Sequence, residues 1–404
     1  MLTTIKRKIQ TARILWGRQH FGFIKQYAKW IDNLHIDKSC FVPYTQTPYV
    51  RKESDVKIFA FYLTQFHAIP ENDKAYGKGF TEWTNVAACT PQYLGHEQPK
   101  IPYDLGFYNL LMPGVMERQA QMAKDYGVYG WCFYYYWFSG KKALEKPLEY
   151  FLNSDIDIHF HLCWANENWS KLWDGGDKEV IFEQKYKKDD AVNFFYDILP
   201  YLQDRRYERI EDKPVLMIYR PQQMTKDYFA RFIQTLQIEA INNGFKGLYI
   251  TESGFSEDNP LEIGLQARIE FRPQGMWMAG KKVICEGFSN NVKTNIYNIE
   301  EYIHKKEYIS EEQFPIYKCC FPSWDNSPRK AYSGGYCFLM NATLFKEWLI
   351  GCIQWTQSHH DQNHQYVYIN AWNEWAEGAI LEPTTRRGYE SLQIVKESIE
   401  ETRL

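Results

Sequence analysis

The sequence predicts an α/β fold, a (β/α)8 barrel of the TIM type with an N-terminal helical extension. Short runs rich in β-branched and aromatic residues alternate with helical periodicity, and polar and aromatic residues collect directly after those runs. Eight strands are expected, at residues 56–63, 128–137, 158–164, 214–219, 247–251, 267–271, 315–321 and 366–371. Helices are expected over 112–126, 143–153, 189–203, 224–243 and 342–357. An open doubly wound sheet is the alternative, and polar segments at so many strand ends favour the barrel.

The predicted barrel domain covers residues 55–395, between a basic extension at 1–54 and a C-terminal tail at 396–404. Residues 1–30 hold seven Lys and Arg and no acidic residue, with apolar residues between them. This pattern fits a helix on the outside of the barrel or a basic amphipathic helix in peripheral contact with a membrane. The charges within residues 5–16 interrupt any apolar core of a signal peptide, which favours a cytoplasmic location, with the helix on the inner membrane face if it binds there.

The overall composition excludes several classes of function. The formal net charge of −3 gives no basic surface for phosphates, so we do not expect a nucleic-acid partner. The nine cysteines are odd in number and mostly lie in apolar runs, as expected for reduced thiols. Neither the cysteine spacing nor any glycine-rich loop predicts a metal site or a cofactor. The aromatic content of 17% suits sugar binding, because an aromatic ring packs on the C–H face of a pyranose.

The segment after the last expected strand carries the strongest functional signal. Glu374 and Glu377 lie three residues apart there, and on a helical turn they would face the same side. Two carboxyl groups close together in an aromatic setting do not ionise together easily, so one keeps a proton as general acid while the other acts as base. We expect these two residues to be the catalytic pair at a glycosidic bond, with Asn373 and Trp375 binding the substrate. A solvated loop is the alternative.

Other polar and aromatic residues at strand ends are candidates for substrate binding. After the third strand, amides and a carboxylate suited to sugar hydroxyls stand beside indole rings, namely Trp164, Asn166, Glu167, Asn168, Trp169 and Trp173. A long loop after the first strand adds Glu82 and Trp83. The remaining candidates share only their position near a strand end: His67, Tyr135, Trp137, Tyr219, Arg220, Glu252, Glu270, Trp324 and Asp325.

Several ordered segments carry a resemblance to a known family. They are FYLTQFHAIPEND, GKGFTEWTNV, YYYWFSGKKALEKP, CWANENW, FPSWDNSPR and NAWNEWAEG. Together they resemble the WbsX family of bacterial polysaccharide-cluster proteins, related to the family 99 endo-α-mannosidases, over about residues 55–395. The resemblance implies a (β/α)8 barrel acting in O-antigen or capsule metabolism. It also implies that Glu374 is a base on the sugar 2-hydroxyl, forming a 1,2-anhydro intermediate, and that Glu377 is the general acid/base. Ala376 stands where the mannosidases have a histidine, so mannose specificity is not implied.

Three functions remain open at this stage, all with an oligosaccharide or polysaccharide as partner. A paired-carboxylate barrel suits a retaining glycoside hydrolase or transglycosidase. A glycosyltransferase with an activated sugar donor is the second function, although neither a DxD-like metal site nor a basic diphosphate pocket is evident. The third is a catalytically silent sugar-binding protein, against which the paired glutamates argue.

Overall fold

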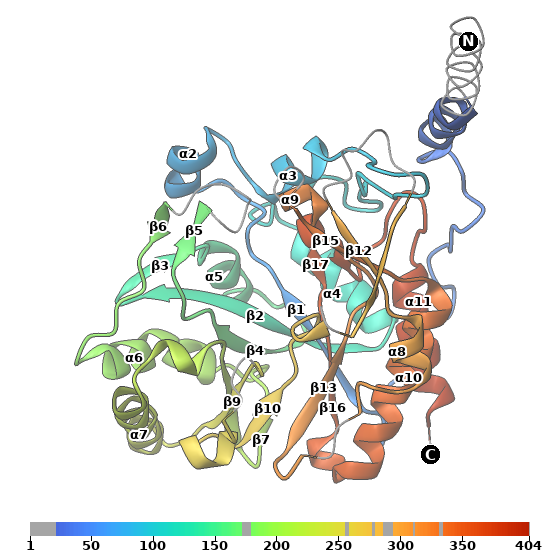
Figure 1. The fold of residues 1–404 in the computed structure, drawn as a ribbon. Helices are drawn as coiled ribbons and strands as arrows, with labels where there is room; N and C mark the ends of the chain where they lie inside the picture. The colour runs from blue at the N-terminus through green and yellow to red at the C-terminus, as the bar shows by residue number, and fades with distance from the viewer. Residues whose placement is uncertain are drawn as a thin grey trace, which may run out of the picture.

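A closed barrel of eight parallel strands lies at the centre of the computed structural model, which describes residues 22–171, 179–254, 258–276, 279–285, 294–309, 312–330 and 334–403 (Figure 1). In chain order the barrel strands are β1 (Lys57–Tyr62), β2 (Val128–Phe138), β4 (His159–Trp164), β8 (Lys213–Ile218), β9 (Tyr249–Glu252), β10 (Ala267–Ile269), β13 (Ile316–Cys320) and β16 (Tyr366–Ile369). Strand β1 pairs in parallel with both β2 and β16, which closes the sheet. The predicted barrel is therefore confirmed.

Long helices cover the outside of the barrel, with α6 and α7 on one side and α10 and α11 on the other (Figure 1). Those that follow barrel strands and were expected are α4 (Val115–Asp125), α5 (Lys146–Leu152), α6 (Asp190–Leu202), α7 (Lys226–Asn242) and α10 (Ala342–His359). The structure differs from the expectation at the C-terminus. Helix α11 (Glu390–Glu401) runs through residue 396, where a tail was expected to begin, because its buried residues Leu392, Val395 and Ile399 follow helical spacing and α11 packs against α10.

Short elements fill the connections between the barrel units. The helices among them are α2 (Pro70–Tyr76), α3 (Glu82–Ala88), α8 (Glu300–His304), α9 (Ser327–Lys330), η2 (Pro221–Gln223), η3 (Pro260–Ile263), η5 (Gln362–His364) and η6 (Trp375–Glu377). The strands are β3 (Lys141–Ala143), β5 (Trp169–Ser170), β6 (Val180–Phe182), β7 (Arg209–Ile210), β11 (Lys281–Val283), β12 (Asn295–Asn298), β14 (Trp324–Asp325), β15 (Tyr336–Leu339), β17 (Asn373–Glu374) and β18 (Ala379–Ile380).

Successive residues of each barrel strand alternate between the barrel interior and the helix layer. On β2, a Cβ at Gly130 would come within 2.4 Å of the Phe59 ring. Glycine at this position therefore makes room for that ring inside the barrel. Tyr134 lies on the same face of β2 as Gly130 and stacks on Phe61 of β1, with ring centroids 6.0 Å apart. Its neighbour Tyr135 faces outward, where its hydroxyl hydrogen-bonds to an aspartate of α6. This alternation decides which aromatic residues reach the site.

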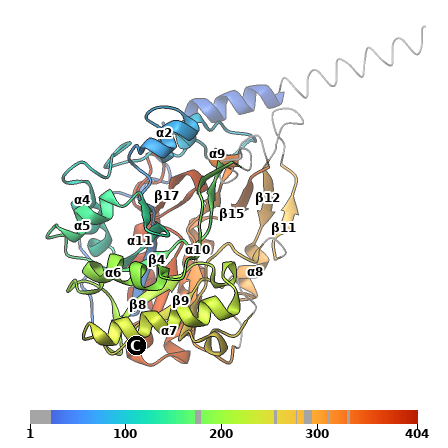
Figure 2. The same cartoon turned by 90° about the vertical axis from the view of Figure 1, so that its left-hand side faces the viewer.

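The N-terminal extension contributes a helix at residues 22–33, which lies outside the barrel (Figures 1 and 2). It contacts the rest of the molecule through the Tyr27 hydroxyl, which donates to the Pro91 carbonyl, and through Trp30, which lies 5.0 Å from the Arg386 guanidinium. Residues 1–21 lie outside the described part of the chain, so membrane contact through residues 1–30 stays a prediction. In the described ranges no helix combines the length and apolarity needed to cross a membrane.

Candidate active site

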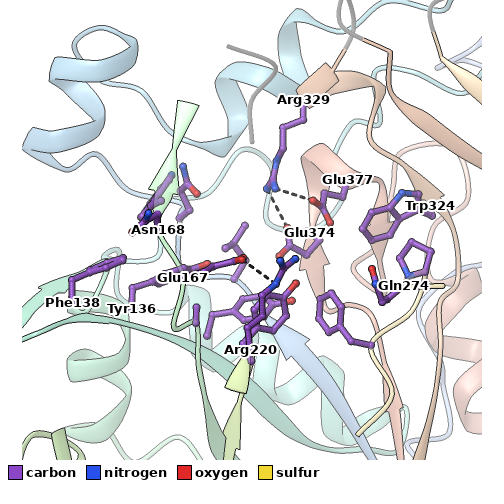
Figure 3. A pocket seen from close by; sticks show the side chains of 18 residues that line it. Tyr136, Phe138, Glu167, Asn168, Arg220, Gln274, Trp324, Arg329, Glu374 and Glu377 are labelled. Carbon is purple, nitrogen blue, oxygen red and sulfur yellow. Dashed lines mark hydrogen bonds and ion pairs between the residues drawn. The ribbon is translucent and has the colours of Figure 1, made fainter. Parts of the chain in front are cut away.

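A cavity of about 210 Å³ opens at the C-terminal ends of the barrel strands (Figure 3). Expected site residues on its wall are Glu167, Asn168, Trp169, Tyr219, Arg220, Trp324, Glu374 and Glu377. The other lining residues are Leu63, Gln65, Tyr134, Tyr136, Phe138, Ala165, Phe271, Pro273, Gln274 and Arg329. Figure 3 shows Tyr136 and Phe138 on one side, Trp324 on the other and the two glutamates between them. The cavity therefore combines aromatic walls with a carboxylate pair.

The two glutamates lie on one tight turn. Glu374 ends β17 and precedes the 3-10 helix η6, which ends at Glu377, so the expected three-residue spacing on a helical turn is present. Gly378 closes the turn in the left-handed region, with φ of 62°, and a Cβ there would lie 3.0 Å from the Asp325 carbonyl oxygen. Glycine is thus needed at this position.

Side chains next to the glutamates fix the turn to the barrel. The Asn373 side chain accepts from the Leu63 amide (2.8 Å) and donates to the Leu63 carbonyl (2.9 Å), which joins the turn to the end of β1. The Trp375 indole donates to Glu382 Oε2 at 2.6 Å. Asn373 and Trp375 were expected to bind substrate, and the structure instead places them behind the cavity wall, where they hold the glutamates in position.

Arg329, on α9, joins the carboxylates. Its guanidinium contacts Glu377 Oε1 at 2.8 Å and Glu374 Oε2 at 3.3 Å, and both contacts are drawn in Figure 3. It also contacts Oε1 of the fully buried Glu82 at 2.6 Å. Glu82, expected to bind substrate from a long loop, is therefore a buried partner of the arginine.

Burial and the neighbouring Glu377 carboxylate raise the pKa of Glu374 well above its ordinary value, and Arg329 opposes the rise. Ionisation of Glu374 is therefore harder than that of an exposed glutamate. Two carboxyl groups on the same guanidinium do not ionise together easily, so the pair can share one proton. This is the arrangement needed for one group to donate a proton while the other accepts one.

A second acid, Glu167, lines the cavity at the end of β4. Its Oε2 lies 2.9 Å from Arg220 Nε, and burial raises the pKa of Glu167 to about 7, opposed by the arginine. Asn166 sits below this pair, and its side chain accepts from the Arg220 amide (2.7 Å) and donates to the Arg220 carbonyl (2.8 Å). Asn166 therefore positions Arg220 from behind the wall, although it was expected to contact substrate.

The expectation that Tyr135, Trp137 and Trp164 line the site is wrong, because these three residues lie on the outward faces of their strands. Trp137 and Trp164 pack against Phe194 of α6, with ring centroids 5.3 and 4.5 Å away. The inward positions of β2 belong to Tyr134, Tyr136 and Phe138. On β2 the prediction was wrong by one residue. Neighbouring residues of a strand point to opposite faces, so this error placed outward-facing side chains in the site.

The other expected residues outside the cavity have structural partners. Trp83 packs on Trp375 with ring centroids 5.2 Å apart. His67 Nδ1 lies 3.0 Å from the Thr64 carbonyl oxygen, and Asp325 lies 2.7 Å from His96. Glu252 pairs with Arg268 and Glu270 pairs with Arg272 and Lys318, whereas Trp173 lies outside the described residues. In the described ranges, no group of three or more His, Cys, Asp or Glu side chains is placed to hold a metal ion.

Arg329 was missed as a site residue, although it ends the segment FPSWDNSPR. Replacing it with methionine should remove the guanidinium that contacts the buried Glu82 and Glu374 and destabilise the fold by about 3 kcal/mol. The raised pKa of Glu374 should rise further, so the loss should grow as pH increases above about 4.5. Thermal melting of Arg329→Met between pH 5 and pH 8 measures this. Lys330→Met, which removes the next charge on α9, is the control, and an equal loss in both variants would contradict the role of Arg329.

The sequence matches the profile of the family described as "Glycosyltransferase WbsX" over residues 58–395. The chain belongs to the WbsX family. Two family relatives, both described as "Uncharacterized protein WxcX" and both from Xanthomonas campestris pv. campestris, are 37% identical to it over 350 residues, which is 85% of this chain and 49% of theirs. The chain spans about half the length of these curated relatives.

Solved structures with the same fold cover nearly the whole chain. A "Glycoside hydrolase-like protein" has a TM-score of 0.52 and 14% identity, over 89% of this chain and 98% of its own. The GH99 endo-alpha-mannosidase from Bacteroides thetaiotaomicron also has a TM-score of 0.52, with 12% identity, over 87% of this chain and 98% of its own. The resemblance to the WbsX family, and the likeness of its fold to that of family 99 enzymes, are thus confirmed.

Proposed function

We propose that this chain is a carbohydrate-active enzyme that cleaves or transfers a glycosidic bond, in the manner of a retaining glycoside hydrolase or transglycosidase, during surface polysaccharide metabolism. The observation that carries the proposal is the placement of Glu374 and Glu377 on one turn, at one guanidinium, in a cavity at the C-terminal face of the barrel. The family description and the names of the solved structures, which refer to carbohydrate-active enzymes, support it.

The cavity wall has the mixture that a sugar ring requires. Aromatic residues that can pack on C–H faces are Tyr134, Tyr136, Phe138, Trp169, Tyr219, Phe271 and Trp324. Three neutral amides on the wall, Gln65, Asn168 and Gln274, can donate to and accept from hydroxyl groups. An oligosaccharide or polysaccharide is therefore the proposed substrate.

In the proposed reaction, Glu374 removes the proton of the substrate 2-hydroxyl, and the alkoxide formed attacks the anomeric carbon. The bond to the leaving oxygen breaks as Glu377 gives that oxygen a proton, which leaves a 1,2-anhydro sugar. Water or an acceptor sugar then opens this ring. The raised pKa of Glu374 makes its carboxylate a stronger base, and Arg329 stabilises the ionised form that removes the proton.

The charges of the cavity favour a glycoside over a diphosphate donor at this position. Both arginines on its wall are already bound to carboxylates, Arg220 to Glu167 and Arg329 to the glutamate pair. A diphosphate would have to compete with those carboxylates for the guanidinium groups. Glycosyl transfer from an activated donor, which the family description favours, is the second candidate function.

The test is to incubate the protein with oligosaccharide repeat units of its host's surface polysaccharides, without nucleotide, and to analyse the products by NMR. New reducing ends or transferred units support the proposal. Parallel reactions supply a nucleotide-sugar or a polyprenyl-diphosphate-sugar, and activity that requires one of these donors supports the transferase instead. Binding of oligosaccharide without product in any reaction would leave the sugar-binding function.

A further inference from the structure

A second cavity, of about 260 Å³, adjoins the catalytic cavity and shares Trp324 with it. Its wall is built from residues of the 93–101 connection, the strands β14 and β15, the start of α10 and residues 380–394. A water molecule takes up about 30 Å³ in the liquid, so the space suits several waters or a small ligand group. The chemistry of its wall indicates which group.

Lys100 is a cation of this wall that contacts only neutral acceptors. Its ammonium donates to Ser323 Oγ and to the Gly378 carbonyl, both at 2.8 Å, and both acceptors are neutral. Within the described part of the chain, no carboxylate comes within ion-pair distance of this ammonium. Burial lowers the pKa of Lys100, and the more distant Asp325 and Glu97 carboxylates only partly offset it. An anion in the cavity would supply the direct partner that this charge lacks.

The two arginines of the same wall already have carboxylate partners. Arg386 and Arg387 both bind Glu97, at 3.1 and 2.8 Å, and the Asp325 carboxylate lies 2.7 Å from the His96 ring. Lys100 is therefore the one Lys or Arg of this wall without a direct carboxylate contact among the described residues. A ligand anion would share the wall with four acids, Glu97, Asp325, Glu382 and Glu390, of which Glu97 and Glu390 already bind arginine.

Two further donors on this wall are unsatisfied. Trp324 Nε1 is buried and has no hydrogen-bond acceptor among the described residues, and its side chain is 5% exposed. Thr385 Oγ1 is also buried and has no partner in the described part of the chain. Buried donors without acceptors are costly, and an acceptor-rich group would satisfy them. One cation and two unused donors around one space suit an oxyanion.

We propose that this second cavity binds a small oxyanion group, either the carboxylate of an acidic sugar or a phosphate, with Lys100 as its direct ion-pair partner. Lys100 also holds the Gly378 carbonyl, which ends the turn that carries the two glutamates, so the bound group would lie next to the catalytic turn. The inference stands apart from the proposed reaction, because binding is measured without turnover.

The experiment measures binding to the whole chain by isothermal titration calorimetry, with glucuronate, inorganic phosphate and neutral glucose as ligands at constant ionic strength. The expected result is saturable binding of glucuronate or phosphate that is stronger than binding of glucose. Binding of glucuronate alone identifies an acidic sugar group, and binding of phosphate alone identifies a phosphate group. No saturable binding of either anion, or equal binding of glucose, would overturn the proposal.

Variants place the binding in this cavity. Lys100→Met should weaken the anion by roughly 10- to 100-fold, as expected when a charge-assisted hydrogen bond is lost. Lys346→Met, which removes a charge paired to Glu397 and Glu401 of α11 and does not line the cavity, should change nothing. Thr385→Val, which keeps the lysine, should weaken anion binding a few-fold. It tests the site if Lys100→Met does not fold. Unchanged affinity in both cavity variants would refute the site.

Discussion

Turnover is expected to fall by about 100- to 10,000-fold when either Glu374 or Glu377 is replaced by glutamine, because the amide keeps the shape of the side chain and cannot transfer a proton. The measurement is kcat/KM on the oligosaccharide that proves to be the substrate. Glu301→Gln changes a surface glutamate bound to lysines and serves as the matched control. A near-wild-type rate in either active-site variant would remove that residue from the mechanism.

The stability of these variants distinguishes a chemical from a structural effect. The raised pKa of Glu374 means that the folded protein resists ionisation of this group, so the wild type loses stability as pH rises above about 4.5. Glu374→Gln has no proton to lose at this position. It should therefore be at least as stable as the wild type at pH 8, as measured by thermal melting, and a strongly destabilised variant would point to a structural role.

The leaving group separates the two roles. A substrate with an activated leaving group, such as a dinitrophenyl glycoside, needs no protonation of the leaving oxygen. Glu377→Gln should recover most of its rate on that substrate, whereas Glu374→Gln should stay slow because the 2-hydroxyl still needs a base. Recovery of Glu374→Gln instead would exchange the two assignments.

A substrate without its 2-hydroxyl is expected to show no measurable turnover. In the proposed reaction this hydroxyl is the nucleophile, held next to the anomeric carbon at a high effective concentration. A 2-deoxy or 2-fluoro glycoside keeps the remaining contacts with the cavity and lacks only that group. The measurement compares its rate with that of the parent glycoside, and inhibition of the parent reaction by the analogue shows that it still binds.

Mass spectrometry of the protein after incubation with the 2-fluoro glycoside tests for the alternative mechanism, direct attack by a carboxylate. If a carboxylate attacks the anomeric carbon directly, a covalent glycosyl-enzyme forms. An ester trapped on Glu374 would therefore exclude participation of the 2-hydroxyl. The residue would then be the nucleophile of a conventional retaining mechanism, while Glu377 would keep its place as acid/base.

The barrel could be predicted because each strand is a separate short apolar run. Such runs are typical of parallel strands that are buried on both faces. Helix α11 was missed because its buried apolar residues are interspersed with charged ones in a short segment near the end of the chain. The apolar face of this helix can be assigned to the core only when it is known that α10 packs against it.

The site was predicted less completely than the fold. Glu374 and Glu377 could be found because both catalytic candidates lie on one short segment. To choose between Tyr135 and Tyr136, one must know which residues of β2 point into the barrel. The sequence does not show this, because β2 is an unbroken run of aromatic residues at that point. Gly130 and Cys132 could have given it, because small residues on alternate positions mark the crowded interior face.

Arg329 illustrates a different limit. Its contact with the glutamate pair joins residues 48 and 45 positions apart, and its contact with Glu82 spans 247 positions. No local pattern predicts which acid an arginine will meet across such separations. The same holds for Asn166, whose type suggested a sugar ligand and whose side chain binds the backbone of Arg220.

The hydrogen bonds between Asn373 and Leu63 join residues 310 positions apart, at the seam where the first and last barrel strands meet. Contacts across so much chain form late in folding, because a long loop must close before they are made. During synthesis, the N-terminal strands leave the ribosome long before β16 and the turn that carries Glu374 and Glu377 exist. In the proposed mechanism, the two glutamates reach their positions only when the barrel closes, so a partly synthesised chain would lack the proposed proton-transfer pair.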